Sequence, residues 1–197
     1  MPQYFDNDVT LGHQDITYKF YLYGKEFTLH SDAGVFSKDG LDEGSKLLLE
    51  TIVKSDLGTS ILDLGCGIGP IGLALASFDP ARHVTLADVN DRALDLARRN
   101  AEEMGLGNVT ILHSDVYENI SSSYSTIVTN PPIRAGKKVT YAMYAGAVSH
   151  LNEGGSLILV IRKQQGASSC FDYLRTLFPN VEMVAKHKGY RILIAKK

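Results

Sequence analysis

The sequence has 197 residues, of which 44% are hydrophobic and 21% are charged, and its formal net charge is −2 at pH 7. This length allows one domain with a large core rather than two ordinary domains, and the composition excludes a disordered chain. A net charge this close to zero argues against a domain devoted to nucleic acid, which would carry an overall positive field.

The two cysteines, Cys66 and Cys170, have neither the spacing of a disulfide framework nor that of a zinc site. The polar and acidic start of the chain does not resemble a signal peptide, and no apolar stretch approaches the roughly 18 residues of a membrane span. The sequence therefore predicts a cytoplasmic protein with no metal and no membrane contact.

The first predicted element is a β-hairpin between Ile16 and Leu29, because apolar residues alternate with polar ones on both sides of a turn at Tyr23-Gly24-Lys25. A helix follows from Leu41 to Val53, where apolar residues recur at helical spacing. We assign residues 1–57 to an N-terminal extension of hairpin and helix, packed on a core domain of residues 58–197.

From Ser60 onward, short apolar runs alternate with helical stretches. The predicted strands are Ile61–Leu64, Val84–Ala87, Val109–Leu112, Thr126–Val128 and Leu157–Ile161. The predicted helices are Ile71–Ser77, Arg92–Met104, Tyr141–Leu151 and Ala167–Leu177. A closing hairpin, Val181–Ala185 with Arg191–Ala195, adds two strands. This alternation predicts an α/β fold with a doubly wound, mostly parallel seven-stranded sheet and an antiparallel C-terminal edge.

A glycine-rich loop, Asp63-Leu64-Gly65-Cys66-Gly67-Ile68-Gly69, follows the first strand of this sheet. Glycines let the backbone turn sharply and approach a bulky ligand, and doubly wound folds bind ligands at this edge. The run Gly67-x-Gly69-x-x-Gly72 on its own would also fit a dinucleotide such as NAD. Asp63 favours S-adenosylmethionine instead, because its carboxylate attracts the ammonium group of that cofactor and repels a pyrophosphate. We expect Asp63, Gly65, Cys66, Gly67 and Gly69 to bind the cofactor.

Two further acids are predicted at neighbouring strand ends. Asp88, followed by Val89, ends the second strand, where its carboxylate can accept both ribose hydroxyl groups. An alternative is that Asp88 caps the next helix, although Asn90 is the better candidate for that cap. Asp115 follows the third strand and is placed to contact the adenine amino group. We assign Asp88, Val89 and Asp115 to the cofactor site.

After the fourth strand come Asn130, Pro131, Pro132 and Ile133. Two successive prolines fix the backbone and lack N–H donors, so we expect the carbonyl groups here to be unpaired. The Asn130 side-chain carbonyl and the Pro131 carbonyl can together accept two N–H bonds from a planar amino group. These two hydrogen bonds would orient the amino nitrogen toward the methyl group of the cofactor. We therefore assign Asn130, Pro131 and Pro132 to catalysis, and Asn130 also to the cofactor site.

Taken together, these motifs resemble the small-domain methyltransferases related to the 16S ribosomal RNA guanine-N2 methyltransferases. The resemblance runs from Gly34-Val35-Phe36-Ser37-Lys38-Asp39-Gly40-Leu41-Asp42, through the glycine loop and Asn130-Pro131-Pro132, to Lys188-Gly189-Tyr190. It implies a Rossmann-like class I methyltransferase fold, S-adenosylmethionine as cofactor, and transfer to guanine N2 in ribosomal RNA.

The sequence departs from this family in two ways. Ile133 stands where family members commonly have an aromatic residue that stacks on the target base, and Phe36 is our candidate replacement. The additional N-terminal domain of the best-characterised members is here only a hairpin and a helix.

A local basic rim is predicted on the substrate side. Arg134, Lys137 and Lys138 follow Ile133, and Arg162 and Lys163 follow the fifth strand of the core. These charges can hold RNA phosphates despite the net charge of the chain. We assign Phe36, Lys38, Ile133, Arg134, Lys137, Lys138 and Lys163 to substrate binding, and expect ribosomal RNA, within the small ribosomal subunit, as the partner.

Four alternatives stay open at this point. The same chemistry could act on adenine in nucleic acid or on a protein glutamine, because Asn-Pro-Pro motifs serve both acceptors. The chain could also be a ribosome-associated factor that binds S-adenosylmethionine with little turnover, or a protein that binds NAD.

Overall fold

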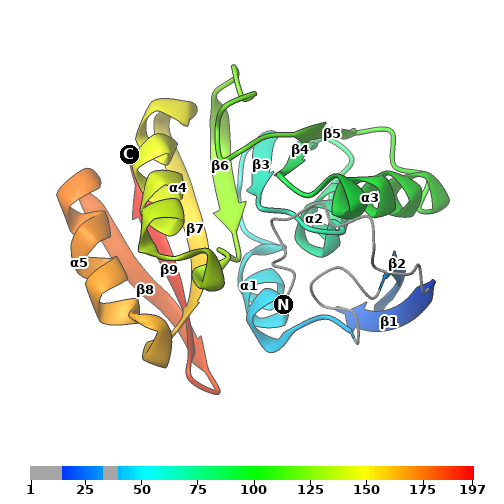
Figure 1. The fold of residues 1–197 in the computed structure, drawn as a ribbon, viewed down its shortest axis with the longest axis horizontal. Coiled ribbons are helices and arrows are strands. Elements are labelled where there is room, and N and C mark those ends of the chain that lie inside the picture. The colour runs from blue at the N-terminus through cyan, green and yellow to red at the C-terminus, as the bar shows by residue number, and fades with distance from the viewer. Residues whose placement is uncertain (1–14, 33–39) are drawn as a thin grey trace.

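The computed structural model describes residues 15–32 and 40–197. A two-stranded sheet of β1 (Ile16–Leu22) and β2 (Lys25–Ser31) precedes the main sheet (Figure 1). The strands of the main sheet are β3 (Ser60–Leu64), β4 (His83–Asp88), β5 (Val109–His113), β6 (Tyr124–Thr129), β7 (Leu151–Arg162), β8 (Asn180–His187) and β9 (Tyr190–Lys196). The α-helices are α1 (Glu43–Ile52), α2 (Pro70–Phe78), α3 (Asp91–Glu103), α4 (Lys137–His150) and α5 (Ala167–Leu177), and the 3-10 turns are η1 (Ile133–Ala135) and η2 (Lys163–Gln165).

The main sheet has seven strands in the order β5-β4-β3-β6-β7-β9-β8. Strands β5, β4, β3, β6 and β7 pair in parallel, whereas β9 runs antiparallel to both β7 and β8. This order confirms the predicted doubly wound sheet with its antiparallel C-terminal edge. Because successive connections leave β3 and β6 in opposite directions, the carboxyl ends of these two neighbours form the topological switch point, where such folds bind ligands.

Helices cover both faces of the main sheet, as alternate residues of its strands show. Ile61 of β3 packs in a cluster with side chains of α1, α2 and α3, whereas the next residue, Leu62, packs in a second cluster with side chains of α4 and α5. In β7, Ile158 and Leu159 divide between the clusters in the same way. The near-continuous apolar runs of the sequence follow from this burial on both faces.

The N-terminal hairpin packs beside α1 and α3 (Figure 1). Its turn has positive φ at Tyr23 (49°) and Gly24 (81°), which fits the right-handed twist of a two-residue hairpin loop. The inward residues Phe20, Phe27 and Leu29 are buried in the same cluster as the first three helices. The helix α1 also contacts β7 and β9, so it is one of the helices of the main sheet. The division at residues 57 and 58 stays a prediction.

Two boundaries differ from the sequence-based expectation by more than two residues. The helix α4 begins at Lys137 rather than Tyr141, because its exposed first turn carries lysines and lacks an apolar pattern. Strand β7 begins at Leu151 rather than Leu157, and its register against β6 shifts between the pairs that Tyr124 and Thr126 form. Gly154 and Gly155 interrupt the apolar pattern, so the sequence did not indicate the first residues of this strand. Among the described residues, no helix is long and apolar enough to cross a membrane.

Candidate functional site

The glycine-rich loop connects β3 to α2 at the switch point. Gly65, Gly67 and Gly69 have φ values of +73°, +56° and +92°, a region that L side chains rarely adopt. The N–H groups of Gly65 and Cys66 both donate to the carbonyl of Ala87, at 2.8 and 3.0 Å. A Cβ on Gly69 would lie 2.9 Å from Leu73 Cδ1. Hydrogen bonds to β4 therefore hold the loop in one conformation. Only glycine is tolerated at position 69.

Asp63 belongs to β3 at the start of this loop, and its side chain is buried. Its Oδ2 accepts a hydrogen bond from the Gly72 N–H at 2.8 Å, while Oδ1 has no hydrogen-bond partner among the described residues. Burial raises the pKa of this carboxyl to about 7, and the nearby Asp88 charge adds to that rise, although the Gly72 N–H opposes it. A buried carboxylate oxygen without a donor fits a cationic ligand group, such as the ammonium group of S-adenosylmethionine.

Asp88 ends β4 and is buried. Its Oδ2 accepts the Gly67 N–H at 2.8 Å, and its Oδ1 accepts the Asn90 N–H at 2.9 Å. A buried carboxylate at the carboxyl end of a strand is an acceptor that suits ribose hydroxyl groups. Asp88 thus also fixes the cofactor loop, a role that the sequence did not indicate. The helix cap is Asn90, as predicted, since its Oδ1 accepts the Ala93 N–H at 3.0 Å.

The other residues predicted for the cofactor site differ in exposure. Val89 is half-buried next to Asp88, and Asp115 is exposed after β5. Cys66 is buried, and this burial raises the pKa of its thiol well above the ordinary value, so it is not a thiolate nucleophile at neutral pH. Residues 15–32 and 40–197 contain no group of three His, Cys, Asp or Glu side chains that could hold a metal ion.

The Asn130 segment leaves β6 beside the glycine loop. A Cβ on Gly65 would lie 3.9 Å from Pro132 Cδ and 3.5 Å from Met143 Cε, so the two loops face each other across a short gap. The Pro131 carbonyl accepts no backbone hydrogen bond from the described residues, as expected. The expectation was wrong for Pro132, whose carbonyl accepts the Ala135 N–H at 2.9 Å because the chain turns at once into η1.

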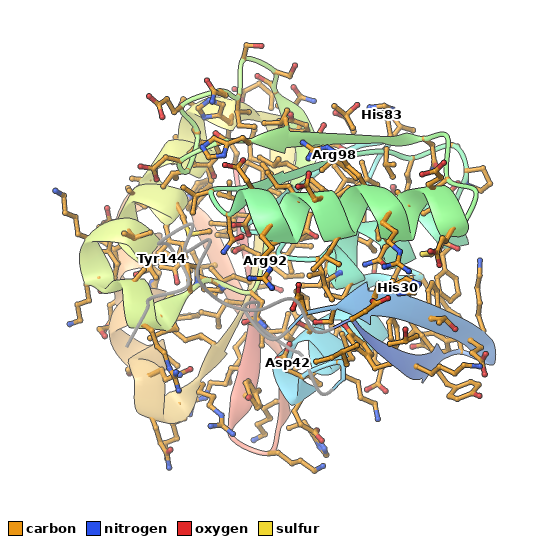
Figure 2. The ribbon with its side chains drawn as sticks, turned by 45° about the vertical axis from the view of Figure 1, so that its right-hand side comes forward. His30, Asp42, His83, Arg92, Arg98 and Tyr144 are labelled. Carbon is orange, nitrogen blue, oxygen red and sulfur yellow. The ribbon has the colours of Figure 1, made fainter. Side chains whose placement is uncertain are left out.

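The Asn130 side chain is held by two residues at the start of α1 that the sequence-based site lacks. Its Nδ2 donates to Asp42 Oδ1 at 3.2 Å and to Ser45 Oγ at 3.0 Å. Figure 2 shows Asp42 at the start of this helix. Asp42 belongs to the segment that carries the family resemblance, but its contact with Asn130 joins residues 88 positions apart and appears only in the folded chain.

Ile133 is half-buried in η1 and lines a pocket between α4 and α5. Further residues of the pocket wall are Lys137, Thr140, Tyr141, Tyr144, Gln165 and Ser169. The OH of Tyr144, a buried residue of α4 that is labelled in Figure 2, has no hydrogen-bond partner within the ranges that the structure describes. An aliphatic side chain at position 133 therefore stands beside a partly polar space rather than forming a stacking platform.

The predicted basic residues follow the carboxyl ends of β6 and β7. Arg134 is in η1, Lys137 and Lys138 begin α4, and Lys163 begins η2. All four are exposed, and none forms a salt bridge with another described residue. Arg162 lies over the Tyr190 ring, 4.7 Å from its centroid. Phe36 and Lys38 lie outside the described residues.

Asn100 of α3 is a third residue that sequence reasoning missed. It is buried, and its Nδ2 donates to the carbonyls of His30 and Ile68, both at 3.1 Å, while its Oδ1 accepts the His30 N–H at 2.7 Å. Figure 2 shows His30 between the hairpin and α3, where its Nε2 also lies 2.7 Å from Glu103 Oε2. Asn100 therefore connects the N-terminal hairpin to the cofactor loop through Ile68.

Comparison with known proteins places this geometry in a family. Residues 26–194 match the model of the methyltransferase small domain. A Bacillus subtilis protein named uncharacterized protein YbxB is 45% identical over 196 residues, which cover 98% of each chain. The ribosomal RNA small subunit methyltransferase C of Erwinia tasmaniensis is 40% identical over 139 residues, which cover 68% of this chain and 40% of that one.

Among solved structures, a T. thermophilus 16S rRNA N2 methyltransferase (RsmC), in complex with AdoMet and guanosine, matches with a TM-score of 0.83 and 29% identity. The match covers 93% of this chain and 50% of that one. The present chain thus spans nearly all of the B. subtilis relative but half or less of these two methyltransferases. By its fold and its matched residues, the chain belongs to the methyltransferase small domain family of S-adenosylmethionine-dependent methyltransferases.

Proposed function

We propose that this protein transfers the methyl group of S-adenosylmethionine to an exocyclic amino nitrogen, that of guanine N2 in 16S ribosomal RNA. The observation that carries the proposal is that the Asn130-Pro131-Pro132 segment lies next to the glycine loop, where a Cβ on Gly65 would lie 3.9 Å from Pro132 Cδ. One loop fits the cofactor, and the other offers carbonyl groups that match the two hydrogens of an amino group. Proximity and orientation supply most of what this displacement needs.

In this proposal each of the three acids of the cofactor site has a physical task. Asp63 Oδ1, which has no partner among the described residues, would accept a hydrogen bond from the cofactor ammonium group, and the carboxylate of Asp88 would accept hydrogen bonds from the ribose hydroxyls. Asp115 would face the adenine. When bound, the cofactor supplies a sulfonium methyl group that a neutral amino nitrogen can attack. In this proposal the step needs neither a metal nor a covalent nucleophile.

The choice of ribosomal RNA rests on the exposed rim and on the relatives. The rim lysines have no carboxylate partners in the described part of the chain, so their charges remain available for phosphates. The ribosomal RNA small subunit methyltransferases that the chain matches carry the substrate in their names. Since the chain covers only part of their length, we expect an assembled or partly assembled small subunit to provide contacts that the chain lacks.

The test is incubation of the protein with labelled S-adenosylmethionine and, separately, with free ribosomal RNA, 30S particles, DNA and protein extract, followed by nucleoside and amino-acid analysis. We expect label in N2-methylguanine from ribosomal RNA. Label in adenine or in glutamine would move the same chemistry to another acceptor and overturn the substrate assignment.

The role of Asn130 is tested with Asn130→Ala in the same assay. We expect loss of methyl transfer while the dissociation constant for S-adenosylmethionine, measured by calorimetry, stays within about threefold, because the proposed contact is made mainly with the acceptor. Calorimetry with NAD in the same series checks the alternative cofactor, and NAD binding without S-adenosylmethionine binding would contradict the proposal.

A further inference from the structure

We propose that Asp42 and Ser45 are positioning residues that force Asn130 to present only its carbonyl oxygen to the acceptor. The site then admits an acceptor atom that brings N–H donors and rejects one that brings only lone pairs. This inference rests on the proposed function, since it explains how that site selects an amino nitrogen.

The geometry uses both hydrogens of the Asn130 amide. Its Nδ2 lies 3.2 and 3.4 Å from the two carboxylate oxygens of Asp42, and 3.0 Å from Ser45 Oγ. A carboxylate only accepts hydrogen bonds, so a flipped amide would place Oδ1 against two negative oxygens. The orientation of the Asn130 amide is thus dictated by chemistry, and its Oδ1 is turned away from Asp42.

Asp42 is itself fixed at the N-terminus of α1. Its Oδ1 accepts the N–H groups of Gly44 and Ser45, both at 3.0 Å, and so caps the helix. Gly44 makes this close packing possible, because a Cβ there would lie 2.9 Å from the Tyr190 ring and 3.0 Å from Asp42 Oδ1. The negative charge of Asp42 is also stabilised by the positive end of the helix dipole. Asp42 and Ser45, which together form a clamp on the Asn130 amide, therefore lie at the start of α1, a helix that packs on the main sheet.

This arrangement strengthens the acceptor oxygen of Asn130. A hydrogen bond from an amide N–H to a carboxylate polarises the amide and places more negative charge on its oxygen. During transfer, the amino nitrogen uses its lone pair to form the N–C bond as the C–S bond breaks, with that electron pair staying on sulfur. The nitrogen then carries positive charge until one proton leaves to water. Its N–H groups therefore bind Asn130 Oδ1 more strongly in the transition state than in the substrate, which raises kcat.

The first experiment compares three variants on the acceptor that the wild-type protein labels. Asp42→Asn keeps the shape and the helix cap but sets an amide against the Asn130 amide. We expect kcat to fall by on the order of 10- to 100-fold, because displacement of a reacting group by about 1 Å can cost the larger factor. KM and the dissociation constant for S-adenosylmethionine should change little. Ser45→Ala should lower kcat in the same way, and Ser45→Thr, which keeps the hydroxyl, should restore it.

Glu43→Gln is the matched control, because Glu43 is exposed in the same first turn of α1 and pairs with Lys188 rather than with Asn130. It removes a negative charge from the same helix end and should leave kcat unchanged. If Glu43→Gln lowers kcat as much as Asp42→Asn does, the effect belongs to the stability of α1 and the inference is overturned.

A swapped pair tests the clamp directly. Asn130→Asp alone sets two carboxylates against each other and should abolish turnover. Combined with Asp42→Asn, it restores a hydrogen bond of reversed polarity and leaves an acceptor oxygen toward the substrate. We expect kcat of the double variant to exceed that of Asn130→Asp at least about tenfold, whereas independent effects would multiply and leave it lower.

A readout without substrate separates failure of this inference from failure of the proposed function. In an ¹⁵N NMR spectrum of the wild-type protein, the Asn130 side-chain amide should exchange slowly with solvent, and Asp42→Asn should speed this exchange at least about tenfold. If ribosomal RNA is not labelled but this difference appears, the substrate proposal fails while the clamp stands. If exchange is fast in the wild-type protein, the clamp does not exist.

Discussion

Asp63 is the residue whose environment differs most from what its position in the sequence suggests. A carboxyl at the end of a strand would ordinarily be ionised at neutral pH, yet burial raises the pKa of Asp63 to about 7. The fold thus keeps a buried acid that is partly protonated at neutral pH without its ligand. A cationic ligand stabilises the carboxylate and releases that proton.

The first prediction concerns the pH dependence of cofactor binding. Only ionised Asp63 attracts the ammonium group, so affinity for S-adenosylmethionine should be constant above about pH 7 and weaken toward about tenfold per pH unit below it. Calorimetry between pH 5.5 and 8.5 in buffers of different ionisation enthalpy, a range of about three units, measures both affinity and proton release. A flat profile across this range would falsify the assigned role.

The variant Asp63→Asn tests the same role from the other side. The amide oxygen can still accept the Gly72 N–H, but the negative charge is gone. We expect affinity to fall by on the order of 10- to 100-fold and to lose its pH dependence. Because the folded protein raises this pKa, the free energy of unfolding decreases as pH rises from the unfolded value of 3.8 to about 7. At pH 8 the variant should therefore unfold at a higher temperature than the wild-type protein.

At the scale of elements, the packing of α2 on β4 sets the position of that acid. A Cβ on Gly72 would lie 2.8 Å from Leu86 Cγ and 3.0 Å from Asp63 Oδ2. Gly72→Ala should lower the free energy of unfolding by about 1–3 kcal/mol and also weaken cofactor binding. Urea unfolding and calorimetry measure the two effects. Gly107→Ala is the control, because nothing lies within 4 Å of its added Cβ, and we expect a change under about 0.5 kcal/mol.

The contact of the hairpin with α3 is the second prediction at this scale. Asn100→Ala removes three hydrogen bonds from a buried residue and leaves backbone groups of His30 and Ile68 without partners. We expect a loss of about 2–3 kcal/mol in the free energy of unfolding and weaker cofactor binding, since Ile68 belongs to the glycine loop. Arg98→Ala on the same helix removes only an exposed pair with Asp95 and should cost under about 0.5 kcal/mol. Equal losses in both variants would show that the hairpin contact is not specific.

At the scale of the whole molecule, basic residues gather at one edge of the main sheet. The net charge of −2 hides a group of basic residues after β6 and β7, which the fold gathers at the carboxyl edge of the sheet together with the candidate site. A protein can therefore hold RNA phosphates locally without an overall positive field.

This distribution predicts how RNA binding depends on salt. Lys137→Ala combined with Lys163→Ala should weaken RNA binding and reduce the salt slope by about two, with cofactor affinity unchanged. Filter binding at several salt concentrations measures the slope. The control pair, Lys54→Ala with Arg175→Ala, removes two charges that follow or end helices leading to the opposite edge. Equal slopes for the two double variants would mean that the rim is not the RNA-binding surface.

Much of this protein is determined by the sequence alone. The order of strands and helices, the glycine loop with Asp63, and the acid at the end of the second strand follow from local patterns, because burial on both faces of a sheet and positive φ angles select particular residues. The start of α4 did not follow, because the exposed first turn of a helix has no apolar pattern. Local chemistry therefore fixed the type of site and the elements that carry it.

Only the tertiary structure decided how that site is assembled. It placed Asp42 and Ser45 on Asn130, joined Asn100 to Ile68, and left Asp63 Oδ1 buried without a partner in the described ranges. The contacts join groups that lie far apart in the chain, and the burial of the Asp63 oxygen also depends on elements that are distant in sequence. Hydrogen bonding and burial of this kind depend on which elements meet in space, and a local pattern carries no information about that.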